Sequence, residues 1–261
     1  MPAPAIVTSG LSRTFAAPGG AVHAVCGLDL TVAAGEVVGF LGQNGAGKTT
    51  TVRMLTTLLV PSGGRAAVAG CDLREDPAGV RRRIGYVAQS GGVDPAVSVG
   101  EELVTQARLH RLPRAAARER ATELAAALGL QDLLARPTGA LSGGQRRRVE
   151  IALGMVNLPD VLFLDEPTTG LDPGSRGELW ELVRRVRAER GTTVFLTTHY
   201  LDEADALADR IVIIDGGRVV ADGGSTELKR RATGDPAASL QDAFLAITGR
   251  QPAAAREPVA L

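Results

Sequence analysis

The chain alternates between short runs that are apolar throughout or nearly so and longer segments whose apolar residues recur every three or four positions. The apolar runs lie at 37–41, 161–164 and 193–197. A strand without polar alternation is buried on both faces, as in the centre of a parallel sheet. Segments 49–59 and about 173–189 carry the helical period. Strands that alternate with helices in this way predict an α/β fold with a mainly parallel sheet.

Other parts of the chain carry the two-residue period of half-buried strands. In the extended region 6–32, Leu28 and Leu30 alternate with polar residues. Residues 61–64 have the sequence Pro-Ser-Gly-Gly and predict a turn. Further short strands are predicted at 66–69, 84–88, 211–214 and 218–221. We therefore expect an antiparallel β subdomain beside the parallel core, and a hairpin late in the chain.

The middle of the chain contains an insertion of a different kind. From about residue 99 to 134 the residues favour helices, and Pro113 marks the first turn of a second helix. Because no strand pattern appears there, we expect an inserted helical subdomain over about 95–158. The chain is then expected to have a main domain over 5–225 and a helical tail over 226–250, whose helix runs from 228 to about 248. A disordered end is expected over 251–261.

Composition excludes several classes of protein. The 261 residues are 44% hydrophobic, and 29 basic residues balance 29 acidic ones, so no positive field attracts nucleic acid. Two arginine runs, 81–83 and 146–148, are interpreted as solvated helix faces or ion-pair partners. Cys26 and Cys71 lack metal-ligand spacing and indicate reduced thiols. No apolar run has the length of a membrane span and no secretory signal is recognised, so a cytosolic protein is expected, unless a partner holds it at a membrane.

A glycine-rich loop lies between the strand at 37–41 and the helix at 49–59. Its glycines let successive backbone N–H groups point inward. The positive end of the helix dipole faces the same spot, so the N–H groups and the start of the helix together form a phosphate site. Lys48 is placed to reach the β- and γ-phosphates, and the Thr49 hydroxyl to bind Mg²⁺. The alternative is a tight turn with a solvated lysine, which the correct flanking elements disfavour. The loop consists of Gly42, Gln43, Asn44, Gly45, Ala46, Gly47, Lys48 and Thr49, followed by Thr50.

Four polar residues directly follow predicted strands: Gln89, Asp165, Glu166 and His199. In open parallel sheets ligands bind beyond the carboxyl ends of the strands, so these residues should meet the phosphate loop at one edge. Asp165 is expected to bind Mg²⁺ and Glu166 to activate a water molecule. His199 is expected to contact the γ-phosphate, and Gln89 both Mg²⁺ and water. Taken singly, each has a plainer explanation, as a helix cap, a structural histidine or a surface glutamine.

A second motif opens the helix that follows residue 141. It consists of Ser142, Gly143, Gly144 and Gln145. Ser142 and Gln145 fit a capping box, so a well-started helix is one explanation. Two glycines in a first turn destabilise a helix, however, and their bare backbone suits close approach by a phosphate. A second anion site in the same chain suggests that it serves a nucleotide held by another subunit.

Together these motifs, with Gly170-Leu171-Asp172, resemble the ATP-binding cassette of ABC transporters across roughly residues 5–225. The resemblance implies a nucleotide-binding domain with a P-loop NTPase core, and a head-to-tail dimer that holds two ATP molecules. It also implies that Phe15, which by itself would suit a core role equally well, stacks on adenine, and that Asp172 lies at the dimer interface. Residues 239–249 resemble the end of ATPase subunits of daunorubicin-resistance exporters, although Gln241 and Ala243 depart from that pattern.

The first hypothesis is therefore the ATPase subunit of a multidrug or natural-product exporter, using ATP and Mg²⁺. Its expected partners are a second ATPase subunit, with a homodimer favoured, and a separate permease that holds it at the cytoplasmic side of the membrane. Export of a lipid or polysaccharide is the alternative within the class. A cassette ATPase acting on ribosomes or DNA is the alternative from another class, and the absence of a heptad array argues against it. A purely regulatory nucleotide sensor is disfavoured because Glu166 and His199 are both present.

Overall fold

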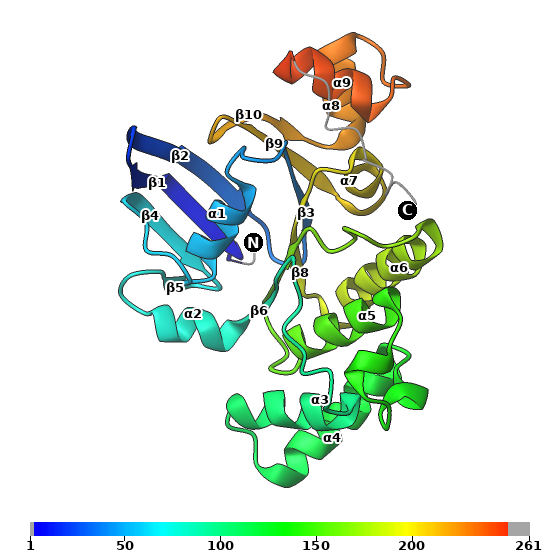
Figure 1. The fold of residues 1–261 in the computed structure, drawn as a ribbon. Coiled ribbons are helices and arrows are strands. Elements are labelled where there is room, and N and C mark those ends of the chain that lie inside the picture. Colours follow the sequence, from blue (N-terminus) through cyan, green and yellow to red (C-terminus); the bar gives the residue numbers. More distant parts are fainter. Residues whose placement is uncertain (1–2, 250–261) are drawn as a thin grey trace.

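The computed structural model describes residues 3–249 and is built around a six-stranded sheet with the order β10-β9-β3-β8-β7-β6 (Figure 1). All neighbouring strands are parallel except the pair β9 and β10. The predicted parallel core is thus confirmed, because β3, β7 and β8 are buried along their whole length. The strands are β3 Val37–Leu41, β6 Ile84–Val87, β7 Val161–Asp165, β8 Thr193–Thr198, β9 Arg210–Asp215 and β10 Arg218–Gly223.

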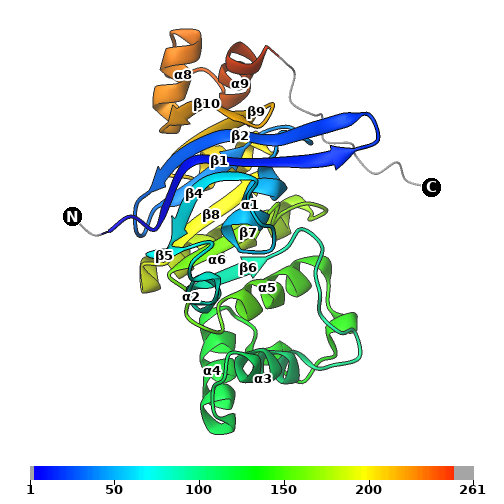
Figure 2. The ribbon, with the colours of Figure 1, turned by 90° about the vertical axis from the view of Figure 1, so that its left-hand side faces the viewer.

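A smaller antiparallel sheet of order β2-β1-β4-β5 lies beside the large one, with helix α1 (Lys48–Leu55) between them in Figure 1, and Figure 2 shows this sheet face-on in front of the large one. Its strands are β1 Ile6–Ala17, β2 Gly20–Val32, β4 Gly63–Val68 and β5 Cys71–Asp72. One apolar cluster joins both sheets and α1, with Leu11 from β1, Val52 from α1 and Phe40 from β3. This is the predicted antiparallel subdomain, and it covers one face of the parallel sheet.

The predicted turn at 61–64 is wrong in its second half, because Gly63 and Gly64 begin β4. Gly64 has a φ of 74°, and a Cβ there would lie 2.3 Å from the Gly10 carbonyl carbon. The two backbones therefore approach where only glycine fits. A Gly-Gly pair read from the sequence indicates a turn, whereas here it permits close strand pairing.

The opposite face of the large sheet is covered by α5 (Gly143–Gly154), α6 (Pro173–Arg190) and α7 (Leu201–Leu207). Helix α6 begins where predicted, since Asp172 Oδ1 accepts a 3.0 Å hydrogen bond from the Ser175 N–H. It ends at Gly191, whose φ of 64° is left-handed. Its buried residues Leu182 and Val186 share one apolar cluster with the helical insertion.

The insertion contains α3 (Val99–Leu109), α4 (Arg114–Ala127) and two 3₁₀ turns, Gln131–Leu133 and Thr138–Ala140, before α5. As predicted, a second helix begins at Pro113, which is the N-cap of α4. The insertion is not wholly free of strand pairing, because Ser98 forms an isolated antiparallel bridge with Pro137. Figure 1 shows this subdomain in green, at the far end of the molecule from the C-terminal tail.

Two helical segments differ from the prediction. Helix α2 (Pro77–Arg83), capped by Asp76, had not been predicted. The tail is not one helix but two, α8 (Ser225–Thr233) and α9 (Leu240–Thr248), separated at Gly234 with a φ of 81°. Both pack on β9 and α7 through Leu228, Leu240 and Phe244. The predicted disordered end, 251–261, lies outside the described residues. Within residues 3–249, no helix is both long and apolar enough to span a bilayer.

Candidate functional site

The glycine-rich loop connects β3 to α1, as predicted. Gly47 is the N-cap of α1 with a φ of 107°, and a Cβ there would lie 2.5 Å from the Ala24 carbonyl oxygen. A Cβ at Gly42 would lie 2.5 Å from the Ile214 carbonyl oxygen. These two positions therefore require glycine, because neighbouring backbone fills the space of a side chain. The loop leads directly into α1, and the first backbone N–H groups of this helix have no hydrogen-bond partners within the helix.

Lys48 is not a solvated lysine. Its side chain is only 4% exposed, and Nζ donates to the carbonyl oxygens of Gly42 (2.8 Å) and Gln43 (3.2 Å). The same Nζ lies 3.1 Å from Glu166 Oε1. The alternative interpretation of a solvated turn lysine is therefore wrong. The charged ammonium group of Lys48 is thus buried inside the loop, where it would contact a phosphate group bound there.

A cavity of about 330 Å³ opens beside this charge. It brings the phosphate loop together with Gln89 and Glu166, two of the predicted strand-end residues, as parallel topology requires. The residues lining it are Ala24, Gln43, Asn44, Gly45, Gly47, Lys48, Thr49, Thr50, Gln89 and Glu166.

Asp165 lies beside the first turn of α1. Its Oδ1 accepts hydrogen bonds from Thr49 Oγ1 (3.3 Å) and from Thr197 Oγ1 (2.6 Å). Hydroxyl and carboxylate oxygens are ligands that suit Mg²⁺, which in nucleotide sites takes one or two from protein and others from phosphates and water. Thr49 Oγ1 and Asp165 Oδ1, which are 3.3 Å apart, offer oxygen donors of that kind. Within residues 3–249, no three or more His, Cys, Asp or Glu side chains cluster as a metal site. Thr197 had not been predicted as part of the site.

Glu166 is surrounded by partners from four segments. Its Oε2 accepts a hydrogen bond from Gln89 Nε2 (3.0 Å) and one from Thr169 Oγ1 (3.4 Å). The Nδ1 atom of His199 lies 3.1 Å from the same oxygen. Burial alone would raise the pKa of the Glu166 carboxyl, but the contacts of His199 and Lys48 outweigh burial and lower the pKa to about 2. The carboxylate is thus ionised. Gln89, Asp165 and Glu166 meet the phosphate loop, and His199 joins the site through its contact with Glu166.

The second motif, Ser142 to Gln145, here called the signature motif, begins α5 and lines no part of this cavity. The capping box is present, because Gln145 N–H donates to Ser142 Oγ (3.2 Å) and Ser142 N–H donates to Gln145 Oε1 (3.0 Å). Ser142 and Gly143 are exposed, whereas Gly144 is buried, and a Cβ there would lie 2.6 Å from Ser175 Oγ. Gly144 therefore permits α5 to pack on the start of α6. Of the two glycines, only Gly143 presents open backbone.

Phe15 is half-buried on β1, opposite Val22 on β2. The guanidinium carbon of Arg13 lies 4.6 Å from the centre of its ring. Phe15 does not line the cavity at the phosphate loop. One of the two faces of the ring is therefore stacked on a cation within the chain.

Of the two interpretations of the run Arg146–Arg148, the ion-pair partner is confirmed for Arg147, which is 6% exposed and pairs with Glu150, whereas the solvated face is wrong for this residue. The helical period carries a signal that could have indicated this, since Arg147 shares a face with Gly144 and Ile151, both buried.

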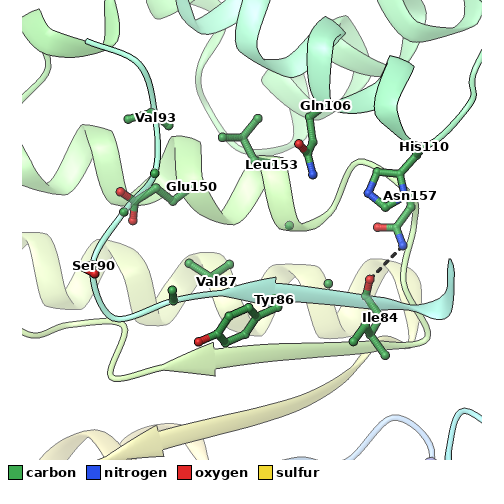
Figure 3. Close-up of a pocket in the computed structure, with 15 residues that line it drawn as sticks. Ile84, Tyr86, Val87, Ser90, Val93, Gln106, His110, Glu150, Leu153 and Asn157 are labelled. Atoms are coloured by element: carbon green, nitrogen blue, oxygen red, sulfur yellow. Dashed lines mark hydrogen bonds between the residues drawn. The ribbon is translucent and has the colours of Figure 1, made fainter. Parts of the chain in front are cut away.

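A second cavity, of about 280 Å³, lies between β6 and the helices α3 and α5 (Figure 3). Gln106, His110 and Glu150 project toward it, and Asn157 Nδ2 donates a 2.9 Å hydrogen bond to the Ile84 carbonyl oxygen. Burial lowers the pKa of His110. One wall is formed by residues 90–92, directly after Gln89. The chain therefore runs directly from the lining of the first cavity, at Gln89, to the lining of the second.

A phosphate loop, a buried acidic pair and a separate signature helix define a nucleotide-hydrolysing cassette. The family model described as "ABC transporter" matches residues 25–169, and the chain belongs to that family. It is an ATP-binding, ATP-hydrolysing subunit of an ABC exporter, so the resemblance found in the sequence is confirmed.

Similar proteins include the daunorubicin/doxorubicin resistance ATP-binding protein DrrA of Streptomyces peucetius. It is 54% identical over 87% of this chain and 68% of that protein. Nod factor export ATP-binding protein I of Ralstonia nicotianae is 40% identical over 86% of this chain and 68% of that protein. Among solved structures, cbiO1 of Clostridium perfringens, part of the ABC transporter complex cbiONQ, is 31% identical, with a TM-score of 0.78 over 87% of this chain and 91% of that one.

Proposed function

We propose that this chain hydrolyses MgATP with Glu166 as the general base and thereby powers export of a drug or natural product through a separate permease. The observation that carries the proposal is the position of the Glu166 carboxylate. It lies between Lys48 of the phosphate loop and the pair Gln89 and His199. A water molecule attacking a phosphate held by the loop would meet these side chains.

The phosphates of ATP would be bound by the backbone N–H groups of the loop from Gly42 to Thr50 and by Lys48. Bound Mg²⁺ supplies positive charge that offsets the phosphate oxygens, and Thr49, Asp165 and Gln89 would hold it. Thr49 Oγ1 and Asp165 Oδ1 are already 3.3 Å apart, which supports their sharing one ion. His199 would contact the γ-phosphate from the end of β8.

Lys48 links nucleotide binding to the strength of the base. A pKa of about 2 makes Glu166 a poor proton acceptor near neutral pH. When Lys48 turns toward phosphate oxygens, Glu166 loses a positive neighbour and gains a negative one, and both changes raise its pKa. Gln89, which donates to Glu166 Oε2, would then hold the carboxylate facing the water.

The signature motif would act on the nucleotide of a second subunit. Ser142 and Gly143 are exposed and begin α5 away from the cavity of their own chain. A helix N-terminus with an open glycine suits an approaching phosphate. A head-to-tail dimer, with an identical chain favoured, would therefore sandwich two ATP molecules, with Asp172 at the interface and the free face of Phe15 on adenine.

The transported substrate is argued from relatives. The 54% identity to a daunorubicin/doxorubicin resistance protein supports drug export, as does the element at 239–249. The 40% identity to a Nod factor export protein keeps export of a lipid or polysaccharide as the alternative. In either case the subunit would be held at the cytoplasmic side of the membrane by its permease, with no nucleic-acid partner.

Co-expression with a permease encoded beside it tests the proposal. We expect the subunit to co-purify with that membrane protein and to lower daunorubicin accumulation in cells, while Glu166→Gln co-purifies without lowering it. Unchanged daunorubicin accumulation, with lipid or polysaccharide exported instead, would favour the alternative substrate. Co-purification with ribosomes or DNA, and with no membrane protein, would refute the exporter assignment.

A further inference from the structure

Arg147 is a buried cation that touches both segments of the candidate catalytic edge. Its Nε donates to the Pro167 carbonyl oxygen (2.8 Å) and Nη2 to that of Asp165 (3.3 Å). Its Nη1 donates to the Ala88 carbonyl oxygen (2.7 Å). Asp165 and Pro167 are the neighbours of Glu166, and Ala88 directly precedes Gln89. One guanidinium thus holds the backbone around both residues.

The backbone at Glu166 needs such support. Its φ is +47°, a left-handed conformation that is unfavourable for a residue with a side chain and persists only where surrounding contacts fix it. On one side, the Glu166 N–H donates to the Thr197 carbonyl oxygen (3.1 Å). On the other, Arg147 binds the carbonyl groups before and after it. The direction in which the carboxylate points follows from these contacts.

Glu150 completes the arrangement. It lies one turn after Arg147 on α5, and its Oε2 accepts a 2.6 Å hydrogen bond from Arg147 Nη1. The two side chains are 7% and 10% exposed, so each charge depends on the other. A Cβ at Gly91 would lie 1.6 Å from Glu150 Oε1. Glu150 therefore packs directly on the segment after Gln89, and Figure 3 shows it beside the stretch that bears Ser90.

We propose that Arg147, with its charge balanced by Glu150, is a positioning residue for ATP hydrolysis. It holds Glu166 in its left-handed backbone conformation and keeps Gln89 against the Glu166 carboxylate. This inference rests on the proposed role of Glu166 as the base. Arg147 belongs to the helix that Ser142 begins, so a displacement of α5 changes the geometry around Glu166.

Replacement of Arg147 by lysine tests the proposal, because one ammonium group cannot span three carbonyl groups and a carboxylate. Arg147→Lys should lower kcat at least tenfold while the KM for ATP changes less than twofold, since the phosphate loop is untouched. The matched control is Arg148→Lys, whose arginine is 25% exposed and pairs with Glu178 of α6. It should keep kcat within twofold. A folded Arg147→Lys variant with normal kcat would overturn the proposal.

A double-mutant cycle separates positioning from a general structural role. If Arg147 acts through Glu166, adding Arg147→Lys to Glu166→Gln should lower the residual single-turnover rate less than twofold. A further tenfold loss would show independent effects and overturn the proposal. Normal turnover by Glu166→Gln alone would instead refute the proposed function.

If Arg147→Lys fails to fold, Glu150→Gln provides the test, because it keeps the side-chain volume and leaves the arginine less balanced. We expect kcat to fall at least threefold and deuterium exchange over residues 88–92 to rise. Normal kcat together with wild-type exchange would overturn the proposal.

Discussion

The ammonium group of Lys48 lies 3.1 Å from Glu166 Oε1, so the cation of the phosphate loop is paired with the carboxylate that follows β7. Lys48 also donates to two carbonyl groups of its own loop. Phosphate oxygens would have to compete for this ammonium group. In the proposed mechanism, binding of ATP would therefore also release Glu166 from its ion pair.

Lys48→Ala should abolish hydrolysis and weaken ATP binding. A charge-assisted hydrogen bond contributes about 1.5–3 kcal/mol, which corresponds to about a 10- to 100-fold loss in affinity. Nucleotide titration and steady-state phosphate release measure both effects. Lys229→Ala is the control, because Lys229 lies on α8 and pairs with Asp205. Undiminished hydrolysis by Lys48→Ala would rule out the assignment of the loop.

Glu166→Gln should bind MgATP, fail to cleave it and accumulate as an ATP-bridged dimer. Glutamine keeps the size of the side chain but cannot accept the proton, and removal of a positioned base slows a reaction on the order of 10²- to 10⁴-fold. Size-exclusion chromatography with and without ATP, beside a phosphate-release assay, measures both outcomes. Asp165→Asn, in contrast, should also weaken binding of MgATP. If Glu166→Gln loses ATP binding, Glu166 belongs to the metal site.

Ser142→Arg should spare ATP binding by the monomer yet prevent the dimer, because Ser142 does not line the phosphate-loop cavity of its own chain. Mixing it with Lys48→Ala produces dimers in which one composite site carries both changes and the other carries neither. We expect ATPase activity to recover in part in the mixture if one intact site turns over alone. Equal loss of ATP binding by monomeric Ser142→Arg would contradict the shared site.

Gly144→Ala should destabilise the fold although alanine favours helices. The added methyl group would lie 2.6 Å from Ser175 Oγ, and overpacking costs about 1–3 kcal/mol. Gly143→Ala is the matched control, since its nearest neighbour would be the Leu171 side chain at 3.7 Å. It should stabilise the helix by about 0.5–1 kcal/mol. Urea unfolding of both variants measures the difference, and equal effects would show that α6 does not restrict Gly144.

Stability should depend on Glu166 at acidic pH. Its pKa in the folded chain is about 2, below the ordinary value of 4.5, so its ionisation stabilises the fold above pH 4.5. This contribution should decline as the pH falls from 4.5 toward 2. The difference in free energy of unfolding between the wild type and Glu166→Gln should shrink over that window in urea titrations. A pH-independent difference would show that Glu166 titrates normally.

Much of the site follows from local sequence. The loop at 42–49, Gln89, Asp165, Glu166 and His199 were located because each follows an apolar strand, and the ends of parallel strands meet at one edge. Thr197 and Thr169 were missed because a threonine in or after a strand carries no distinctive pattern. For Arg147 the sequence left a solvated face and an ion pair both open, because its burial depends on carbonyl groups at or just after the ends of β6 and β7, far away in the chain.

The sequence by itself determined the α/β class, the order of the strands along the chain and the identity of the loop that would meet a phosphate. These features depend on the spacing of apolar residues and on turn residues, both of which act between residues close together in the sequence. Tertiary structure alone decided that Gly63 and Gly64 enter a strand, that the tail breaks at Gly234, and that Lys48 pairs with Glu166. Each depends on contacts between segments far apart in the chain. Such contacts are decided by how the folded segments pack, which the local sequence pattern does not contain.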